Sequence, residues 1–199
     1  MPKKDVRVAV LVSGGGSNLQ AILDAQKSGK LPGITVVLVL SSKADAYALT
    51  RARNSGIDTA IVERKAFPSE ESAQAAVLEK LEQSRADVVC LAGYMRKLGA
   101  GIVRRYKGRI LNIHPALLPK FGGPGMYGPH VHEAVLAAHE KESGCSVHVV
   151  DEEYDHGPVL AQAKVPVLQN DTVETLAARV LEQEHMLYPK ILREFSENL

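Results

Sequence analysis

The chain is poor in three features that mark particular classes of protein: cysteine, charge of one sign and long apolar runs. Its 199 residues include two cysteines, Cys90 and Cys145, and they form no CxxC pair. We therefore expect neither a disulfide framework nor a thiolate metal site. The formal net charge is +1, which gives no overall field to attract nucleic acid or an anionic membrane. Any anionic ligand must be bound by a local site.

Membrane insertion and division into domains are also disfavoured. No apolar run approaches the roughly 18 residues that a membrane-spanning helix needs. Lys3 and Lys4 precede an apolar stretch that is too short for a secretory signal and runs directly into glycines. The length fits one compact domain, and no repeat or linker divides the chain. We expect a single domain over residues 1–199, in a cytoplasmic protein with no membrane partner.

Short β-branched runs dominate the first half, which is typical of strands covered on both faces. These runs lie at residues 6–13, 34–42, 87–93 and 109–114. Helical patterns separate them, at residues 17–29, 46–56 and 69–86. The alternation predicts an α/β fold that is Rossmann-like, with a mostly parallel sheet and helices on both faces.

The second half predicts an antiparallel element in place of a further parallel crossover. Strand-like runs at 146–150 and 159–165 flank a polar link, as in a hairpin. A long amphipathic helix follows, with Asp171 or Thr172 as its cap. Its predicted apolar face consists of Leu176, Val180, Leu181 and Leu187. Residues 121–130 are rich in glycine and proline and are predicted to form a loop beside the site.

A glycine loop, "SGGGSN", follows the first strand and opens directly into a helix. Backbone N–H groups at such a helix start form an anion site, because glycine lets a ligand approach closely. The dinucleotide fingerprint requires a glycine where Leu19 stands, and an acidic residue where the second strand ends in Ser41, Ser42 and Lys43. The loop thus favours one phosphate of a small molecule over NAD. The alternative is a tight turn without a ligand, in which Ser17 and Asn18 only cap the helix.

An amide and an imidazole lie together in "RILNIHPALLP" at the end of a predicted strand. Asn112 and His114 are two residues apart, so they point to the same face of the sheet. An amide N–H and a protonated imidazole form a donor pair for an oxygen that gains negative charge. Asp155 is the best candidate for the carboxylate that orients the imidazole and accepts a proton. Taken singly, each residue has a purely structural alternative, as a satisfied strand end or a turn former.

Other catalytic motifs are absent or incomplete. His132 and Glu133 begin a possible HExxH motif, but Leu136 occupies the position of the second histidine. No Gly-x-Ser-x-Gly elbow is present. We therefore expect no metal and no covalent enzyme intermediate, with the nucleophile supplied by a substrate.

Five segments together resemble the folate-dependent phosphoribosylglycinamide formyltransferase family. They are "SGGGSNLQAI", "LAGYMRKL", "LNIHPALLPKF", "GCSVHVVDEEYDHGP" and "ARVLEQEHMLYP". They occur in the family's order, and the likeness extends from Val6 to about Phe195. Chance agreement of all five is improbable.

The resemblance implies transfer of a formyl group from 10-formyltetrahydrofolate, as co-substrate, to the amine of glycinamide ribonucleotide in purine synthesis. It implies that Asn112, His114 and Asp155 are catalytic and that Glu184 contacts the ribose or glycinamide portion of the substrate. The phosphate-binding residues implied by the family are Gly16, Ser17 and Asn18. The implied walls of the folate pocket are Met95, Arg96, Lys97 and Leu98 on one segment and Val150, Asp151, Glu152, Glu153 and Tyr154 on another. No metal is implied.

Several alternatives remain open at this point. Methionyl-tRNA formyltransferase and formyltetrahydrofolate deformylase share the "HPALLP" core but normally carry an extra domain, for which we expect no room here. The near-neutral charge also disfavours a nucleic-acid partner. A formyltetrahydrofolate hydrolase or a non-catalytic nucleotide-binding module is the alternative function. His156, which follows Asp155, and Ala116 depart from the family pattern. The sequence leaves open a monomer or a homodimer.

Overall fold

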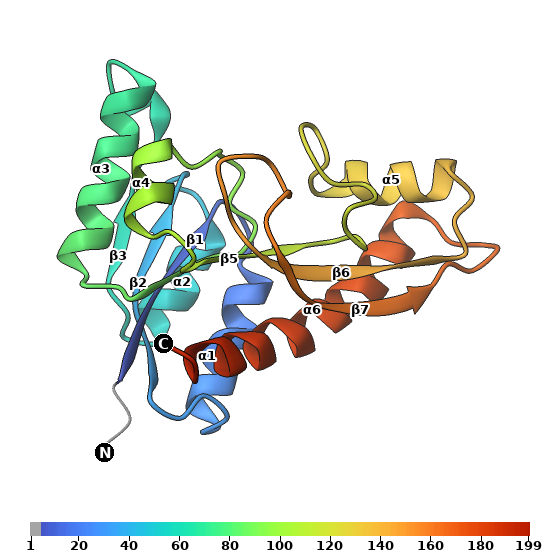
Figure 1. Ribbon diagram of the computed structural model, residues 1–199, viewed down its shortest axis with the longest axis horizontal. Coiled ribbons are helices and arrows are strands. Elements are labelled where there is room, and N and C mark those ends of the chain that lie inside the picture. The colour runs from blue at the N-terminus through green and yellow to red at the C-terminus, as the bar shows by residue number, and fades with distance from the viewer. Residues whose placement is uncertain (1–4) are drawn as a thin grey trace.

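A seven-stranded mixed sheet forms the centre of the protein in a computed structural model that describes residues 5–199 (Figure 1). Lys3 and Lys4 of the sequence argument lie outside the described residues. The strands are β1 (Val6–Val12), β2 (Ile34–Ser41), β3 (Thr59–Ile61), β4 (Val88–Leu91), β5 (Ile110–His114), β6 (Glu142–Val149) and β7 (Val159–Pro166). Their order across the sheet is β3-β2-β1-β4-β5-β6-β7. β1 to β5 pair in parallel, whereas β6 and β7 join antiparallel, as the sequence predicted.

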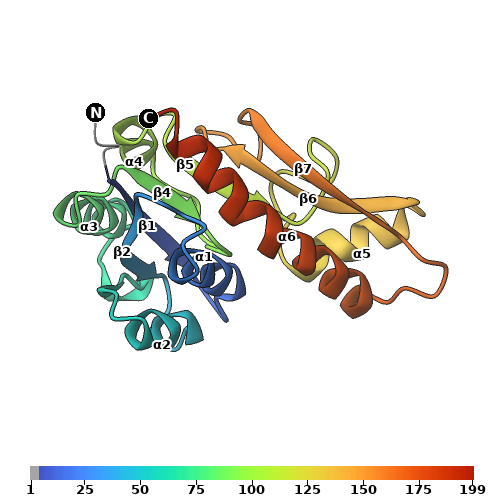
Figure 2. The same ribbon diagram turned by 90° about the horizontal axis from the view of Figure 1, so that it is seen from below.

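The helices cover both faces of this sheet (Figure 2). They are α1 (Ser17–Lys27), α2 (Tyr47–Asn54), α3 (Glu70–Gln83), α4 (Ala100–Arg105), α5 (Pro129–Ala137) and α6 (Val173–Ser196), with a 3-10 turn at Arg64–Ala66. Buried residues of α1, α2 and α6 pack in one apolar cluster, and those of α3 and α4 pack in another. Alternating strand residues supply the two clusters: Val8 and Val10 of β1 belong to the first, and Ala9 and Leu11 to the second.

Helix starts follow the capping chemistry of the sequence. Ser69 begins α3, and its hydroxyl accepts from the N–H of Ser72 in a capping box. Thr172, one of the two predicted caps, does the same for α6 through Thr175. Leu176, Val180 and Leu187 are buried as predicted, whereas Leu181 is only half-buried. None of the helices within residues 5–199 combines the length and hydropathy needed to cross a bilayer.

Three short elements were missed from the sequence, namely β3, α4 and α5. β3 has 3 residues and α4 has 6, which is too few for periodicity to show. α5 begins with Pro129 inside the segment 121–130 that was predicted to be a loop. Its start is marked by Gly128 and by proline in its first turn, a common opening for a helix.

The sheet order places a topological switch between β1 and β4. From β1 the chain proceeds outward through β2 to β3, and it then returns to add β4 and β5 on the other side. The connections after β1 and β4 consequently leave in different directions at the carboxyl edge of the sheet. Ligands of open α/β sheets bind in the crevice formed at such a point.

Candidate active site

The glycine loop between β1 and α1 has an open side and a packed side. Gly14 and Gly15 have no heavy atom within 4 Å of the place where a Cβ would lie. A Cβ on Gly16, in contrast, would lie 2.5 Å from Cβ of Ala48, and the φ of Gly16 is +72°. Glycine is therefore required at position 16 by backbone conformation and by contact with α2. The other two glycines leave room for a ligand.

The N-terminus of α1 is available to an anion. Ser17 and Asn18 are the first two residues of the helix, its N-cap is Gly16, and no side chain caps it, so neither residue acts as the cap. The first N–H groups of a helix have no carbonyl one turn earlier to accept their hydrogens. The loop is held from outside by Arg51, whose Nε donates to the carbonyl of Gly15 at 2.8 Å. A helix start of this kind, a nest of backbone N–H groups, has the backbone geometry that anion-binding sites use.

Glu184 lies beside this nest although it is distant in the sequence. Asn18 Nδ2 donates to Glu184 Oε2 at 2.6 Å. Burial raises the pKa of the Glu184 carboxyl, and the hydrogen bond from Asn18 opposes that rise. Asn18 Oδ1 is buried without a hydrogen-bond partner among the described residues. The pair therefore keeps unused hydrogen-bonding capacity next to the helix start.

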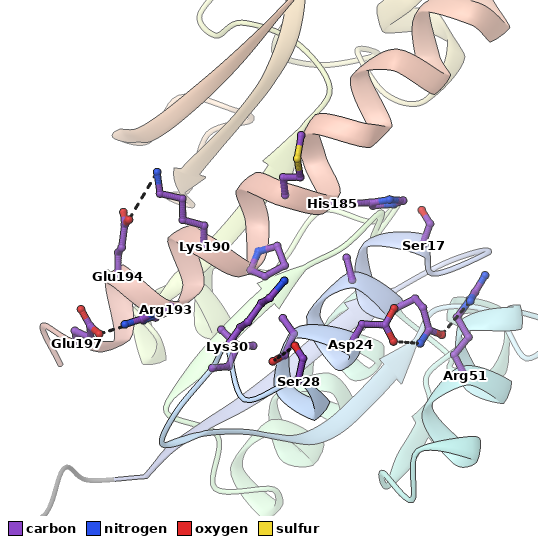
Figure 3. Close-up of a pocket in the computed structure, with 16 residues that line it drawn as sticks. Ser17, Asp24, Ser28, Lys30, Arg51, His185, Lys190, Arg193, Glu194 and Glu197 are labelled. Atoms are coloured by element: carbon purple, nitrogen blue, oxygen red, sulfur yellow. Dashed lines mark hydrogen bonds and ion pairs between the residues drawn. The ribbon is translucent and has the colours of Figure 1, made fainter.

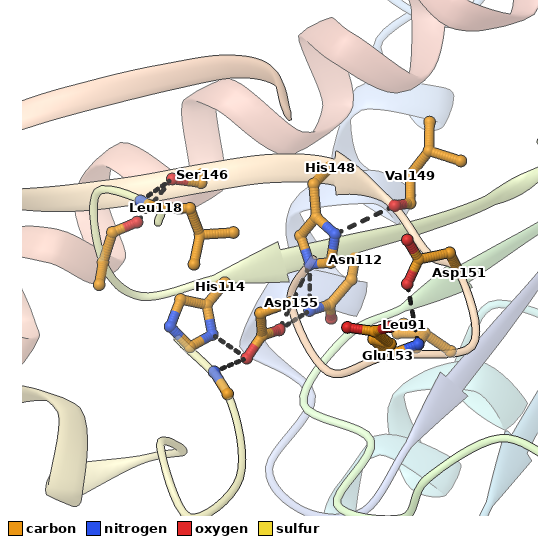
Figure 4. Close-up of polar contacts among 12 residues, drawn as sticks. Leu91, Asn112, His114, Leu118, Ser146, His148, Val149, Asp151, Glu153 and Asp155 are labelled. Atoms are coloured by element: carbon orange, nitrogen blue, oxygen red, sulfur yellow. Dashed lines mark hydrogen bonds and ion pairs between the residues drawn. The ribbon is translucent and has the colours of Figure 1, made fainter. Parts of the chain in front are cut away.

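Asn112, His114 and Asp155 converge, as Figure 4 shows. Asn112 and His114 lie on β5, and Asp155 comes from the connection between β6 and β7. Asn112 Nδ2 lies 3.5 Å from Asp155 Oδ1, and His114 Nδ1 lies 3.6 Å from Asp155 Oδ2. The side chains of His114 and Asp155 are only 4% and 11% exposed, so a charge on either one is poorly solvated.

A tight turn places the carboxylate of Asp155. Its φ is +52°, in the left-handed region. The adjacent Gly157 passes so close to β6 that a Cβ there would lie 1.8 Å from the carbonyl oxygen of Val149. On the other side, the N–H of Gly123 donates to Asp155 Oδ2 at 3.0 Å. Hydrogen bonds and nearby imidazoles outweigh the burial of Asp155 and lower its pKa.

The ring of His114 has a defined proton on one nitrogen. Nε2 lies 2.8 Å from the carbonyl oxygen of Phe121, and because a carbonyl only accepts, Nε2 carries a hydrogen. Burial lowers the pKa of His114, while the charge of Asp155 opposes that change. The resting imidazole is therefore neutral at pH 7, and Nδ1 faces Asp155 with a free lone pair. The sequence argument had expected a charged donor from the start.

His148 is a fourth polar residue of this cluster. It faces Asn112 across the antiparallel pair of β5 and β6. Its Nε2 lies 3.0 Å from Asn112 Nδ2 and 3.4 Å from Asp155 Oδ1. Nδ1 of His148 lies 3.2 Å from the carbonyl oxygen of Val149, so this nitrogen carries the proton and Nε2 accepts from the amide. This arrangement orients the Asn112 amide.

The two segments expected to line a folate pocket lie next to one another. The ammonium of Lys97 sits 5.0 Å from the ring centre of Tyr154, a cation–π distance. Glu152 Oε1 lies 3.8 Å from Nη1 of Arg104, in the helix α4 that follows residues 95–98. Met95 is exposed, whereas the side chain of Leu98 is buried in the core. Only the backbone of Leu98 is therefore available to a ligand.

A separate groove of about 1120 Å³ lies between α1 and α6 (Figure 3). Its lining includes Lys30, Arg193 and Glu194, and it includes Ser17 at one end. Asn112, His114 and Asp155 are not among its lining residues. The groove therefore does not coincide with the polar cluster, and it shares only Ser17 with the predicted site.

The structure brings the predicted catalytic trio together and places Glu184 beside Asn18. It adds three groups that the sequence did not reveal: His148 and the backbones of Phe121 and Gly123. His148 lies opposite Asn112 in the pairing of β5 with β6. The sequence does not reveal this register, so it could not identify His148 as part of the site. Within residues 5–199, no group of three or more His, Cys, Asp and Glu side chains is arranged to hold a metal ion.

Comparison with known proteins shows the family to which the chain is related. The model of the formyl transferase family matches residues 6–192. Phosphoribosylglycinamide formyltransferase of Escherichia coli (strain K12) is 46% identical over 192 residues, which cover 96% of this chain and 88% of that protein.

Two solved structures show the same likeness in three dimensions. Glycinamide ribonucleotide transformylase 1 from Symbiobacterium toebii aligns with a TM-score of 0.93 and 43% identity, covering 100% of this chain and 90% of that one. Phosphoribosylglycinamide formyltransferase from Brucella melitensis aligns with a TM-score of 0.89 and 49% identity, covering 97% and 96%. The chain belongs to the formyl transferase family and, within it, to the phosphoribosylglycinamide formyltransferases.

Proposed function

We propose that the protein transfers the formyl group of 10-formyltetrahydrofolate to the primary amine of glycinamide ribonucleotide. Formyl transfer is the chemistry of its family, and the names of its relatives specify the ribonucleotide. The observation that best supports the proposal is the convergence of Asn112, His114 and Asp155 at one sheet edge. A module that only bound a nucleotide would not need this cluster. We assign all these groups to one domain, because they border a single sheet.

The ribonucleotide is assigned to the glycine loop and α1. Its phosphate is bound by the N–H groups of Gly16, Ser17 and Asn18, where the helix dipole favours negative charge. Glu184 contacts the ribose or glycinamide portion, since Asn18 holds its carboxyl beside the phosphate position. This arrangement directs the amine toward the end of β5.

Folate is assigned to the walls formed by residues 95–98 and 150–154. The pterin is bound there by backbone groups, and Lys97 and Tyr154 join the two walls. The formyl carbon then lies over Asn112 and His114, within reach of the amine. Holding two reactants in this way replaces a bimolecular encounter by an intramolecular step.

Charge stabilisation is the first task of the trio. Attack of the amine nitrogen on the formyl carbon places a negative charge on the formyl oxygen. The Asn112 amide donates to that oxygen with the hydrogen that now points along the long, 3.5 Å contact to Asp155. A prearranged donor of this kind acts in a poorly solvated site without reorganisation.

Proton transfer is the second task. The attacking nitrogen becomes positively charged and releases one proton to the free Nδ1 of His114. Asp155, 3.6 Å away, stabilises the imidazolium that forms, and this cation then also faces the oxyanion. As the intermediate collapses, the C–N bond to folate breaks, and the proton passes to the departing N10. The products are formylated ribonucleotide and tetrahydrofolate, so atoms and charge balance.

A coupled assay of formyl transfer tests the proposal. Wild-type protein with 10-formyltetrahydrofolate and glycinamide ribonucleotide should produce tetrahydrofolate only when both substrates are present. Release of formate in the absence of ribonucleotide, at the same rate, would instead identify a hydrolase, because water would be replacing the amine. In calorimetric titration, binding of the nucleotide without any binding of a folate analogue would identify a non-catalytic module.

A further inference from the structure

Ser13 is a buried serine that the proposed reaction does not use. It follows β1 directly and precedes the glycine loop, and its side chain is only 4% exposed. Its hydroxyl oxygen accepts from the backbone N–H of Met95 at 2.9 Å. It also lies 2.6 Å from the hydroxyl of Ser42, at the end of β2. One hydroxyl therefore connects the chain segments that follow three different strands.

The position of this hydroxyl coincides with the switch in strand order. The β1–β4 ladder ends at the pair Leu11 and Leu91, and a last backbone bond runs from Ala92 N–H to the Leu11 carbonyl. Beyond it, one segment turns into the glycine loop and the other leads to Met95. The Ser13 hydroxyl extends the connection across the point where the two backbones separate.

The bland explanation is that Ser13 merely satisfies a buried polar group. The identity of its two partners, the Met95 N–H and the Ser42 hydroxyl, supports a more specific role. Met95 opens the segment assigned to folate, whereas Ser13 adjoins the loop assigned to phosphate. The hydroxyl of Ser42, also buried, is the second hydrogen-bond partner of Ser13. The contact thus joins the segment that follows β1 to the segments that follow β4 and β2.

We propose that Ser13 is a positioning residue that holds the ribonucleotide and folate half-sites at the separation required for formyl transfer. It touches neither substrate, and the inference rests on the function proposed above. Each half-site is complete without Ser13, because the phosphate nest and the folate walls are built by other residues. Loss of the hydroxyl therefore impairs the meeting of the two substrates more than the binding of either one.

The decisive variant is Ser13→Ala, assayed at saturation of both substrates. We expect kcat to fall at least about tenfold, since a misplacement near 1 Å can cost on the order of 100-fold in rate. Calorimetry with glycinamide ribonucleotide alone, and with a non-reactive folate analogue alone, should give Kd values within about threefold of wild type. Parallel tenfold losses of kcat and of both affinities would show a general structural role and overturn the proposal.

Ser143→Ala is the matched control. Ser143 is also buried, at 2% exposure, and its hydroxyl has no hydrogen-bond partner within the described residues. This variant should keep the wild-type kcat. A loss of kcat in Ser13→Ala no larger than that in Ser143→Ala would overturn the proposal.

A second pair of variants decides the matter if Ser13→Ala fails to fold. Ser13→Thr and Ser13→Val have nearly the same shape and differ in the hydroxyl. Activity in the threonine variant alone supports the proposal, and equal kcat values in the two overturn it. A wild-type protein without ribonucleotide-dependent transfer would instead defeat the proposed function, so the two failures are distinguishable.

Discussion

Asn112 is the residue whose chemistry depends most directly on its neighbours. Its amide nitrogen is held by His148 at 3.0 Å, which leaves one hydrogen directed at the weaker contact with Asp155. The sequence predicted that Asn112 and His114 point to the same face of the sheet, because side chains alternate along a strand. It could not predict His148, because the contact depends on the register between β5 and β6. The sequence could not predict Phe121 and Gly123 either, because they contact His114 and Asp155 through backbone atoms, which every residue type has.

The first prediction concerns Asn112→Ala. Removing one prearranged oxyanion donor typically costs on the order of 100 to 1000-fold in rate, and we expect a fall in kcat of that size. The fold should persist, because Asn112 is only half-buried. Steady-state kinetics together with circular dichroism check both parts. Asn170→Ala, at an exposed turn, is the control, and wild-type turnover in Asn112→Ala would contradict the assigned role.

The second prediction concerns the pH dependence of His114. Proton transfer to Nδ1 requires the neutral ring, so kcat/KM should fall on the acid side as His114 becomes protonated. Burial lowers the pKa of His114 from 6.5, which places this acid limb below pH 6.5. The charge of Asp155 raises the pKa of His114 and opposes burial. In Asp155→Asn the residual activity should therefore have its acid limb at lower pH than wild type.

The same shifts act on stability, with signs that follow from linkage. The pKa of His114 is lowered in the folded protein, so the unfolded chain binds the proton more readily, and stability declines as pH falls from about 6.5. The pKa of Asp155 is also lowered, so its contribution is present above about 3.8 and is lost as pH falls through the folded value. Urea unfolding of Asp155→Asn across pH should lack the second decline. For activity, an acid limb of kcat/KM that moves to higher pH in Asp155→Asn would refute the coupling of His114 and Asp155.

At the scale of elements, the strand-to-helix turn before α1 shows why sequence patterns succeed locally. The order strand, glycines, helix predicted an anion nest, and the structure has the helix start with no side-chain cap. β1, β2, β4 and β5 were predictable because burial on both faces requires continuous apolar runs. α5 was not, since the glycines and prolines before it obscure where the loop ends. The capping boxes of α3 and α6 show the opposite case, in which local chemistry marks the boundary.

The third prediction compares two glycines that flank α1 and share a left-handed conformation. Gly16 has φ +72° and no space for a Cβ, whereas Gly29 has φ +74° and open space around it. Gly29→Ala should cost roughly 1–2 kcal/mol of unfolding free energy from backbone strain alone. Gly16→Ala should cost roughly 1–3 kcal/mol more, because its methyl group meets Ala48. Urea denaturation measures both, and equal losses would show that the contact with α2 adjusts without cost.

At the scale of the whole molecule, α6 connects the two halves of the sheet to the site. Its N-terminal part lies along β6 and β7, and it then crosses toward β4 and β5 (Figures 1 and 2). The helix places Glu184 beside Asn18 at the start of α1. One turn later, the buried hydroxyl of Tyr188 lies 3.0 Å from the carbonyl oxygens of both Leu91 and Leu111. The Leu91 carbonyl ends β4, and the Leu111 carbonyl directly precedes Asn112 on β5. One face of α6 therefore carries both Glu184 and a side chain that contacts these two strands.

The fourth prediction follows from that contact. Tyr188→Phe removes the hydroxyl hydrogen that these two buried carbonyls share, and loss of a typical intramolecular hydrogen bond costs about 0.5–1.5 kcal/mol. We expect the free energy of unfolding in urea to fall by about that amount. Tyr106→Phe is the control, because the Tyr106 side chain is also buried but its hydroxyl makes no hydrogen bond within residues 5–199. Equal stability of the two variants would mean that the Tyr188 hydroxyl does not help to hold the ends of β4 and β5 in place.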